Sequence, residues 1–248
     1  MRDLFSIKVG WGLREETVEA CASRSVRMLN DLWDIHRDFR TLRWDGVGHV
    51  TVRNLHELCQ RGDLVRILKR RRVHNTSRTR IVSDGYDMSA NSGVGSSQSL
   101  HLRLHAGAGS EDADRIWLPN EIELTIIPGE EVDAVVSMLL ALRPTLLAMV
   151  DAWDVDWGGL YSTSRIAQTI TGAERFRWRF SGAWAVYLAD RFAERVTPPR
   201  QAVVERRCTR GVLISAAKEV FDASNPAQVE AANAIDASLE PLKPWPEE

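Results

Sequence analysis

The stretch that organises this chain is residues 131–158, EVDAVVSMLLALRPTLLAMVDAWDVDWG. Its first part places apolar residues on nearly every side of a helix: Val132, Val135, Val136, Leu139, Leu140, Leu142, Leu146, Leu147, Met149 and Val150. A helix that is apolar all round belongs in a protein core or in a membrane. Asp133, Ser137 and Arg143 interrupt the run before about 20 apolar residues have accumulated, so we predict a buried core helix at 131–152.

Two features near this helix modify the prediction. Pro144 has no N–H to donate to the preceding turn, which predicts a kink or two consecutive helices. After Ala152 the sequence changes to Trp-Asp-Val-Asp-Trp-Gly, in which large rings alternate with carboxylates. Such side chains are costly to bury, so the exit of the helix is a candidate functional site.

The overall composition is that of a soluble globular protein. The 248 residues are 44% hydrophobic and 27% charged, with a net charge of −2. The three cysteines are odd in number, far apart and without a CxxC pair, which fits a reducing cytosol better than a disulfide framework. The N-terminus lacks the continuous apolar segment of an export signal, so we expect a cytoplasmic protein.

Periodicity elsewhere predicts a single α+β domain spanning residues 1–248, with a mostly antiparallel sheet. Its three principal helices are expected at 15–39, 131–152 and 226–239, packed on that sheet. Residues 81–110, rich in Ser, Gly and Asn, are expected to form edge strands and turns. Within them LHLRLH (100–105) should point its leucines inward and its histidines outward. Residues 164–181 are expected to form a loop. The other strands are predicted at 4–12, 121–127, 160–163, 183–188, 202–206 and 211–215.

Several motifs resemble the immunity protein 52 family of bacterial polymorphic-toxin systems. The first is a Trp-Gly-x-Arg turn, followed by an acidic residue and a helix with a Cys-Ala pair, at Trp11, Gly12, Arg14, Glu16, Cys21 and Ala22. The others are the Trp153–Gly158 motif, the Gly182–Leu188 strand, and the Phe221–Leu239 turn and helix. Together these motifs span most of the chain.

The resemblance implies an immunity protein that binds a cognate toxin and neutralises it by stoichiometric complex formation. The toxin would be a nuclease-domain effector delivered between bacteria, for instance by type VI secretion. The resemblance implies no catalytic activity. From the residues themselves we expect no cofactor, no metal and no membrane association.

Two other functions remain open from the residues alone. Asp154-x-Asp156 could hold Mg²⁺ or Mn²⁺ as the DxD motif of many glycosyltransferases does, or it could simply cap the chain where it leaves the helix. Such an enzyme would also need a donor-binding fold, typically doubly wound α/β. The second alternative is nucleic-acid binding through the basic run 66–80, although such runs are more often a solvated helix end. The Arg-rich segment 61–80 is also a possible local insertion.

Acidic residues are concentrated in the middle of the chain. Residues 111–156 contain eleven acidic side chains and two basic ones. A protein that binds a nuclease can place carboxylates where the nuclease expects phosphates, which steers the encounter. These acids could equally be neutralised by nearby arginines. The predicted partner-binding residues are Asp112, Asp114, Asp151, Asp154, Asp156 and Trp157, with the last three expected to face solvent from a rigid turn.

Overall fold

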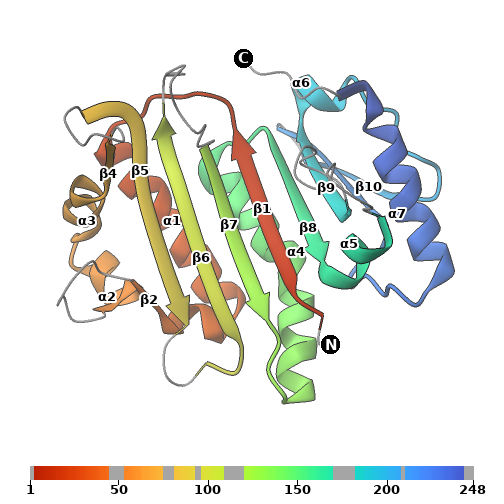
Figure 1. The fold of residues 1–248 in the computed structure, drawn as a ribbon, viewed down its shortest axis with the longest axis horizontal. Coiled ribbons are helices and arrows are strands. Elements are labelled where there is room, and N and C mark those ends of the chain that lie inside the picture. Colours follow the sequence, from red (N-terminus) through yellow and green to blue (C-terminus); the bar gives the residue numbers. More distant parts are fainter. Residues whose placement is uncertain are drawn as a thin grey trace.

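The fold is built on one large twisted sheet. The structure is a computed structural model that describes residues 3–44, 53–74, 81–92, 96–108, 120–169, 182–207 and 210–242. Its 11-stranded sheet has the order β10-β11-β9-β8-β1-β7-β6-β5-β2-β3, with β4 also paired to β5 (Figure 1). The strands are β1 Phe5–Trp11, β2 Leu42–Trp44, β3 Arg53–Asn54, β4 Arg72–His74, β5 Ile81–Ser92, β6 Ser99–Ala108, β7 Asn120–Ile127, β8 Trp157–Ser162, β9 Ala183–Ala189, β10 Val203–Arg207 and β11 Gly211–Ser215. All of these pairings are antiparallel.

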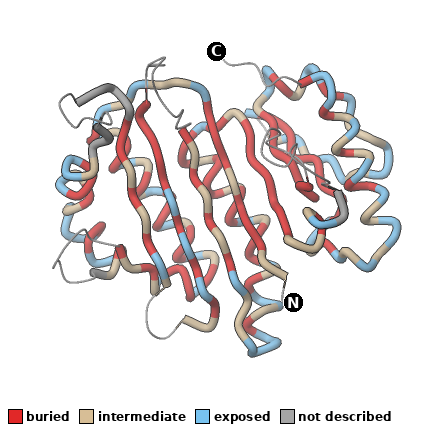
Figure 2. Tube along the Cα trace, in the orientation of Figure 1, coloured by how far each residue is buried: buried red, intermediate tan, exposed pale blue. Residues whose placement is uncertain are grey.

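Two long helices cover one face of this sheet. The helices of the described chain are α1 Val18–Ile35, α2 Leu55–Gln60, α3 Leu64–Arg70, α4 Val132–Trp153, α5 Thr163–Thr169, α6 Asp190–Ala193 and α7 Pro226–Ser238, with short 3-10 turns η1 Arg37–Thr41 and η3 Glu240–Leu242. Helices α1 and α4 lie side by side behind the strands in Figure 1. Ile7, Val9 and Trp11 of β1 point to this side, because side chains alternate along a strand. The main core lies between these helices and the sheet, where the strands are predominantly buried (Figure 2).

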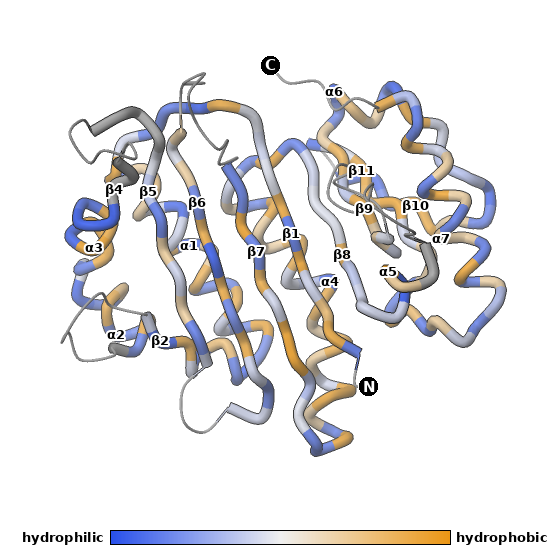
Figure 3. Tube along the Cα trace, in the orientation of Figure 1, coloured by the Kyte–Doolittle hydropathy of each residue, from blue (hydrophilic) through white to orange (hydrophobic). Residues whose placement is uncertain are grey.

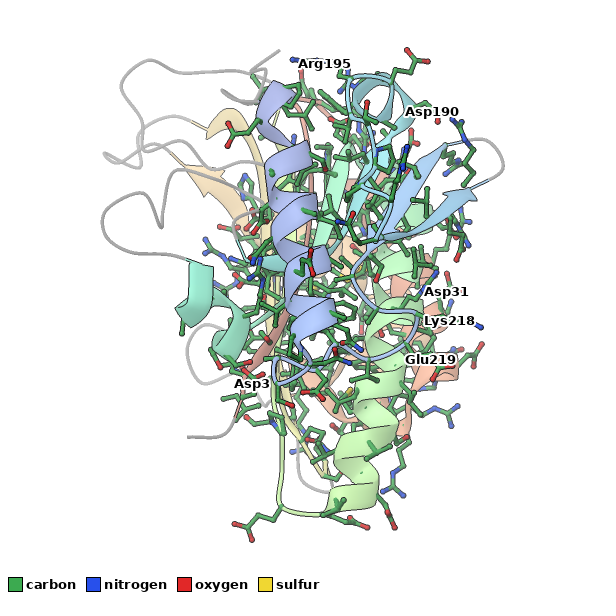
Figure 4. All side chains as sticks on the ribbon, turned by 90° about the vertical axis from the view of Figure 1, so that its right-hand side faces the viewer. Asp3, Asp31, Asp190, Arg195, Lys218 and Glu219 are labelled. Atoms are coloured by element: carbon green, nitrogen blue, oxygen red, sulfur yellow. The ribbon has the colours of Figure 1, made fainter. Side chains whose placement is uncertain are left out.

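On the other face, the described helices α5 and α7 cover the β8–β9–β11 end. Figure 4 shows α5 and α4 on opposite sides of the sheet. Helix α7 contacts β9 and β11, and Arg165 of α5 pairs with Asp236 of α7 at 2.8 Å. The predicted α+β class, the antiparallel sheet and its three principal helices are therefore confirmed.

Helix α4 corrects two expectations. It runs unbroken through Pro144, so the prediction of two consecutive helices is wrong. Pro144 lies on the exposed side, where water can bond the carbonyl that has no helical donor. The helix is also less buried than predicted, because Val132, Val136 and Leu140 are exposed. By length and composition α4 could cross a membrane, a property that core helices of soluble proteins share.

The middle of the sheet also differs from expectation. Strands β5 and β6 are long interior strands, not edge strands, because β2 and β4 pair with the outer side of β5. The leucines of LHLRLH face the core as predicted, while His105 is buried on the opposite face against Asp87. The start of the expected loop 164–181 forms α5, and residues 170–181 lie outside the described chain.

Candidate functional site

The two Trp-containing motifs meet at the C-terminal end of α4. The Trp11 ring stacks on the Trp153 ring, with centroids 5.1 Å apart and an angle of 20° between the planes. The backbone N–H of Gly12 donates to the Asp156 carboxylate at 2.8 Å, and the N–H of Asp156 donates to the Gly10 carbonyl at 3.0 Å. Residues that are far apart in the sequence therefore build one structural unit.

Two arginines cap this end of the helix. Asp154 has a left-handed backbone with φ of 53°, which ends α4. Arg14 donates to the Trp153 carbonyl at 2.8 Å, and Arg24 donates to the Ala152 carbonyl at 3.3 Å. Glu16 holds both guanidinium groups, at 2.5 Å from Arg14 and 3.2 Å from Arg24. Cations suit this position because the last carbonyls of a helix lack partners and carry partial negative charge.

Arginines lie beside three of the carboxylates that were expected to bind a partner, Asp151, Asp154 and Asp156. Arg207 contacts Asp151 at 2.9 Å, and Arg191 contacts Asp156 at 2.7 Å. Asp154 is the most exposed of the three, with 61% of its side chain accessible, and it lies 3.9 Å from Arg210 and 4.0 Å from Arg14. Of the two explanations for these acids, the geometry of this cluster favours neutralisation within the fold.

The same cluster shifts the titration of Tyr187. Burial raises the pKa of this phenol to about 12, and the neighbouring carboxylates Asp151 and Asp154 add to the effect. Its hydroxyl donates to the Arg210 carbonyl at 2.7 Å. Tyr187 is therefore a neutral structural donor that fixes the backbone of an arginine in the cluster.

Trp157 does not face solvent, so that prediction is wrong. Its side chain is 1% exposed, and its ring lies directly over Gly10 of β1. A Cβ atom on Gly10 would lie 2.6 Å from the ring, closer than real Cβ contacts allow. The chain enters β8 at Trp157 and pairs this residue with Gly10, so the ring is fixed by the sheet. Asp156, also expected at the surface, is largely buried by Gly12 and Arg191.

The remaining site predictions concern Asp112, Asp114 and the basic segment 61–80. Asp112 and Asp114 lie outside the described residues, as do residues 75–80 of the basic run. The described part of that run is a helix end, in which Lys69 pairs with Glu19 at 3.1 Å. Segment 61–74 is integrated into the fold, because α3 packs on α1 and β4 pairs with β5. Whether segment 61–80 is an insertion stays a prediction.

The geometry offers little support for metal or thiol chemistry. Within the described ranges, no three His, Cys, Asp or Glu side chains are grouped to hold a metal ion. Asp154 and Asp156 diverge toward different arginines instead of converging on one point. The antiparallel sheet also differs from the doubly wound fold that a glycosyltransferase would need. Burial raises the pKa of the Cys21 thiol to about 12 and that of Cys59 to about 11, so neither is a ready nucleophile.

A separate hollow lies between α1 and α2. This surface pocket of about 510 Å³ is lined by Trp33, Asp34, Arg40, His56 and Glu57, among others. The Trp33 and His56 rings meet edge to face, with centroids 4.3 Å apart. No sequence pattern pointed to this pocket, because its lining residues come from four separate elements: α1, η1, β3 and α2.

Comparison with known proteins places the chain in a family. A solved structure of the Pseudomonas aeruginosa T6SS protein PA0821 is similar in fold, with a TM-score of 0.57 and 8% sequence identity, over 96% of this chain and 76% of that chain. No curated protein matches the sequence. The family model described as immunity protein 52 matches residues 4–242, which include the Trp11–Glu16 turn and the Trp153–Gly158 exit of α4. The chain therefore belongs to the immunity protein 52 family.

Proposed function

We propose that this chain neutralises a cognate toxin by binding it in a stoichiometric complex, in the cytoplasm of the cell that makes it. The observation that carries the proposal is the family match over residues 4–242, because an immunity protein implies a toxin partner. The contacts of the motif residues support binding over catalysis. Trp11, Arg14 and Glu16 stabilise the end of α4, which holds the neighbouring surface rigid.

The proposed toxin is a nuclease-type effector delivered between bacteria. A nuclease must bind phosphates, so its substrate-binding surface is basic. Exposed carboxylates such as Asp154, Glu131 and Asp133 complement a surface of that kind. The T6SS protein with a similar fold supports delivery by a type VI system.

Coexpression with the toxin tests the function. The first step is to find whether a gene beside that for this chain encodes a secreted protein, and the probe is the C-terminal domain of that protein. Coexpression should restore growth, and calorimetry should give a 1:1 complex. In a nucleic-acid degradation assay, activity should fall to zero at one equivalent of this chain. Rescue of growth by a variant that does not bind the toxin would contradict inhibition by binding.

Of the predicted partner contacts at the C-terminal end of α4, only those of Asp151 and Asp154 are still proposed. Asp154 and Asp151 keep accessible carboxylates, whereas Trp157 has no exposed surface with which to touch a partner. If the toxin docks there, Asp151→Asn/Asp154→Asn should slow its association and weaken the salt dependence of the rate. An unchanged association rate would place the docking surface elsewhere.

A further inference from the structure

The N-terminal half of α4 exposes a row of apolar side chains. Val132, Val136 and Leu140 are 72%, 49% and 50% exposed. They are spaced four residues apart, so they lie one above another along the helix. Ala134, Met138 and Ala141 occupy the opposite side and are buried. We call Val132, Val136 and Leu140 the α4 row.

The row is exposed because α4 extends beyond its neighbours. Near the end of α4, Ala152 meets Arg24 of α1, and the two helices then run in opposite directions. Helix α1 ends at Ile35, about 16 Å further along at 1.5 Å per residue, so it accompanies only the second half of α4. In Figure 1 the start of α4 protrudes past the ends of the strands. At the same end, Figure 3 shows hydrophobic segments between hydrophilic ones, and Figure 2 shows exposed segments.

The surroundings of the row are acidic. Residues 127–142 contain Glu130, Glu131 and Asp133 but neither Lys nor Arg. Acidic residues in the first turn stabilise the helix dipole, which accounts for their charge without a partner. That account does not extend to Val132, Val136 and Leu140, which gain nothing from exposure to water. An apolar row with an acidic border is the composition of a docking surface.

Pro144 adds a hydrogen-bond acceptor to this surface. Proline has no N–H, so the Leu140 carbonyl receives no bond from the residue four positions later. Both Leu140 and Pro144 are exposed, which places this acceptor within reach of a donor from outside. Lys and Arg side chains are such donors.

We propose that the α4 row, with Glu131 and Asp133, enters an apolar groove bordered by basic side chains on the cognate toxin. The inference rests on the proposed function and names the surface and partner chemistry for it. A helix whose apolar side fits a groove is a recurrent mode of recognition, with anchors at this spacing. Basic side chains at the groove border match both the carboxylates and the Leu140 carbonyl.

Charge argues against a second copy of this chain as the occupant. In a parallel pairing a second copy would present the same carboxylates to Glu131 and Asp133, and in an antiparallel pairing it would present the uncharged residues 139–141. The first basic residue after the row, Arg143, is already bound by Glu205 and by the Lys218 carbonyl. Figure 4 places Lys218 beside the middle of α4 together with an acidic neighbour, Glu219. The partner must therefore supply the positive charge.

Substitutions in the row test the proposal, with the neighbouring-gene toxin domain as the probe. Val136→Arg and Leu140→Arg should each weaken binding by about tenfold or more in calorimetry, because a cation cannot enter an apolar groove with a basic border. The melting temperature should change little, since both side chains are half exposed. Glu131→Gln/Asp133→Asn should slow association and weaken its salt dependence.

Val204→Arg on β10 is the matched control, because Val204 is 46% exposed and carries no part of the proposed surface. It should bind the toxin as the wild type does. Wild-type affinity in Val136→Arg/Leu140→Arg would overturn the docking surface while leaving the proposed function intact. Absence of any complex with the wild-type chain would overturn both. A wild-type dimer that these substitutions dissociate would assign the row to a second copy and overturn the proposal.

Discussion

Replacing Trp157 by Ala distinguishes a core residue from a contact residue. The side chain is 1% exposed, and its ring packs on Gly10 in the centre of the sheet. Removing a buried Trp side chain costs about 3–5 kcal/mol, the sum of lost apolar burial and the cavity left behind. For a domain of this size, that loss corresponds to roughly 10 °C in melting temperature. The magnitude can be measured by urea unfolding and by thermal melting.

Gly10→Ala provides an internal check on the same packing. In the wild-type protein the new methyl group would lie 2.6 Å from the Trp157 ring, so the substitution should cost about 1–3 kcal/mol. In the Trp157→Ala background the ring is gone, and Gly10→Ala should then cost almost nothing. Equal costs in both backgrounds would refute the contact. A Trp157→Ala variant with an unchanged melting temperature but faster toxin dissociation would refute the assignment of Trp157 to the core.

Two further predictions concern the arginine cluster and the buried titratable groups. Arg14→Gln should lower the free energy of unfolding by about 1–3 kcal/mol, because it removes a charged donor from the end of α4. Arg191→Gln removes a more exposed ion pair and should lower it by at most about 1 kcal/mol. Urea unfolding compares the two variants, and equal losses would contradict the capping role of Arg14. In the folded state, burial raises the pKa values of Cys21, Cys59 and Tyr187 to about 11 to 12. In the unfolded state the same groups ionise at their ordinary, lower pKa values. The free energy of unfolding should therefore fall as pH rises above about 9. Unfolding curves between pH 7 and pH 10 measure this slope, and constant stability over that range would contradict the burial of these groups.

Local patterns predicted the strands with alternating apolar residues and the helices with apolar residues at helical spacing. The alternation in LHLRLH identified the core-facing leucines of β6, and the periodicity of residues 226–239 identified α7. The same reasoning misplaced β5 and β6 at the edge of the sheet, because small polar residues are typical of edges. Their interior position depends on β2 and β4, which pair with β5 from other parts of the chain.

The candidate site shows why the charges along the sequence were not enough to predict its ion pairs. Sequence reasoning identified Asp151, Asp154 and Asp156 as a dense acidic group, and that density is real. It could not assign their partners, because Arg191, Arg207 and Arg210 are tens of residues away and meet the acids only when β9, β10 and β11 pair. An ion pair depends on distance in space, which charge counts along the chain do not contain.

The α+β class, the main helices and strands, and the family motifs could be predicted from the chain alone, because each depends on local spacing or on residue identity. The burial of Trp157 and the exposure of Val132, Val136 and Leu140 could not be predicted in this way. All four residues are apolar, so hydropathy treats them alike. Trp157 is covered because β8 pairs with β1. The α4 row is uncovered because α1 lies beside the C-terminal half of α4 and not beside its N-terminal half. Burial is set by what the rest of the chain places against a side chain, and that is a property of the assembled fold.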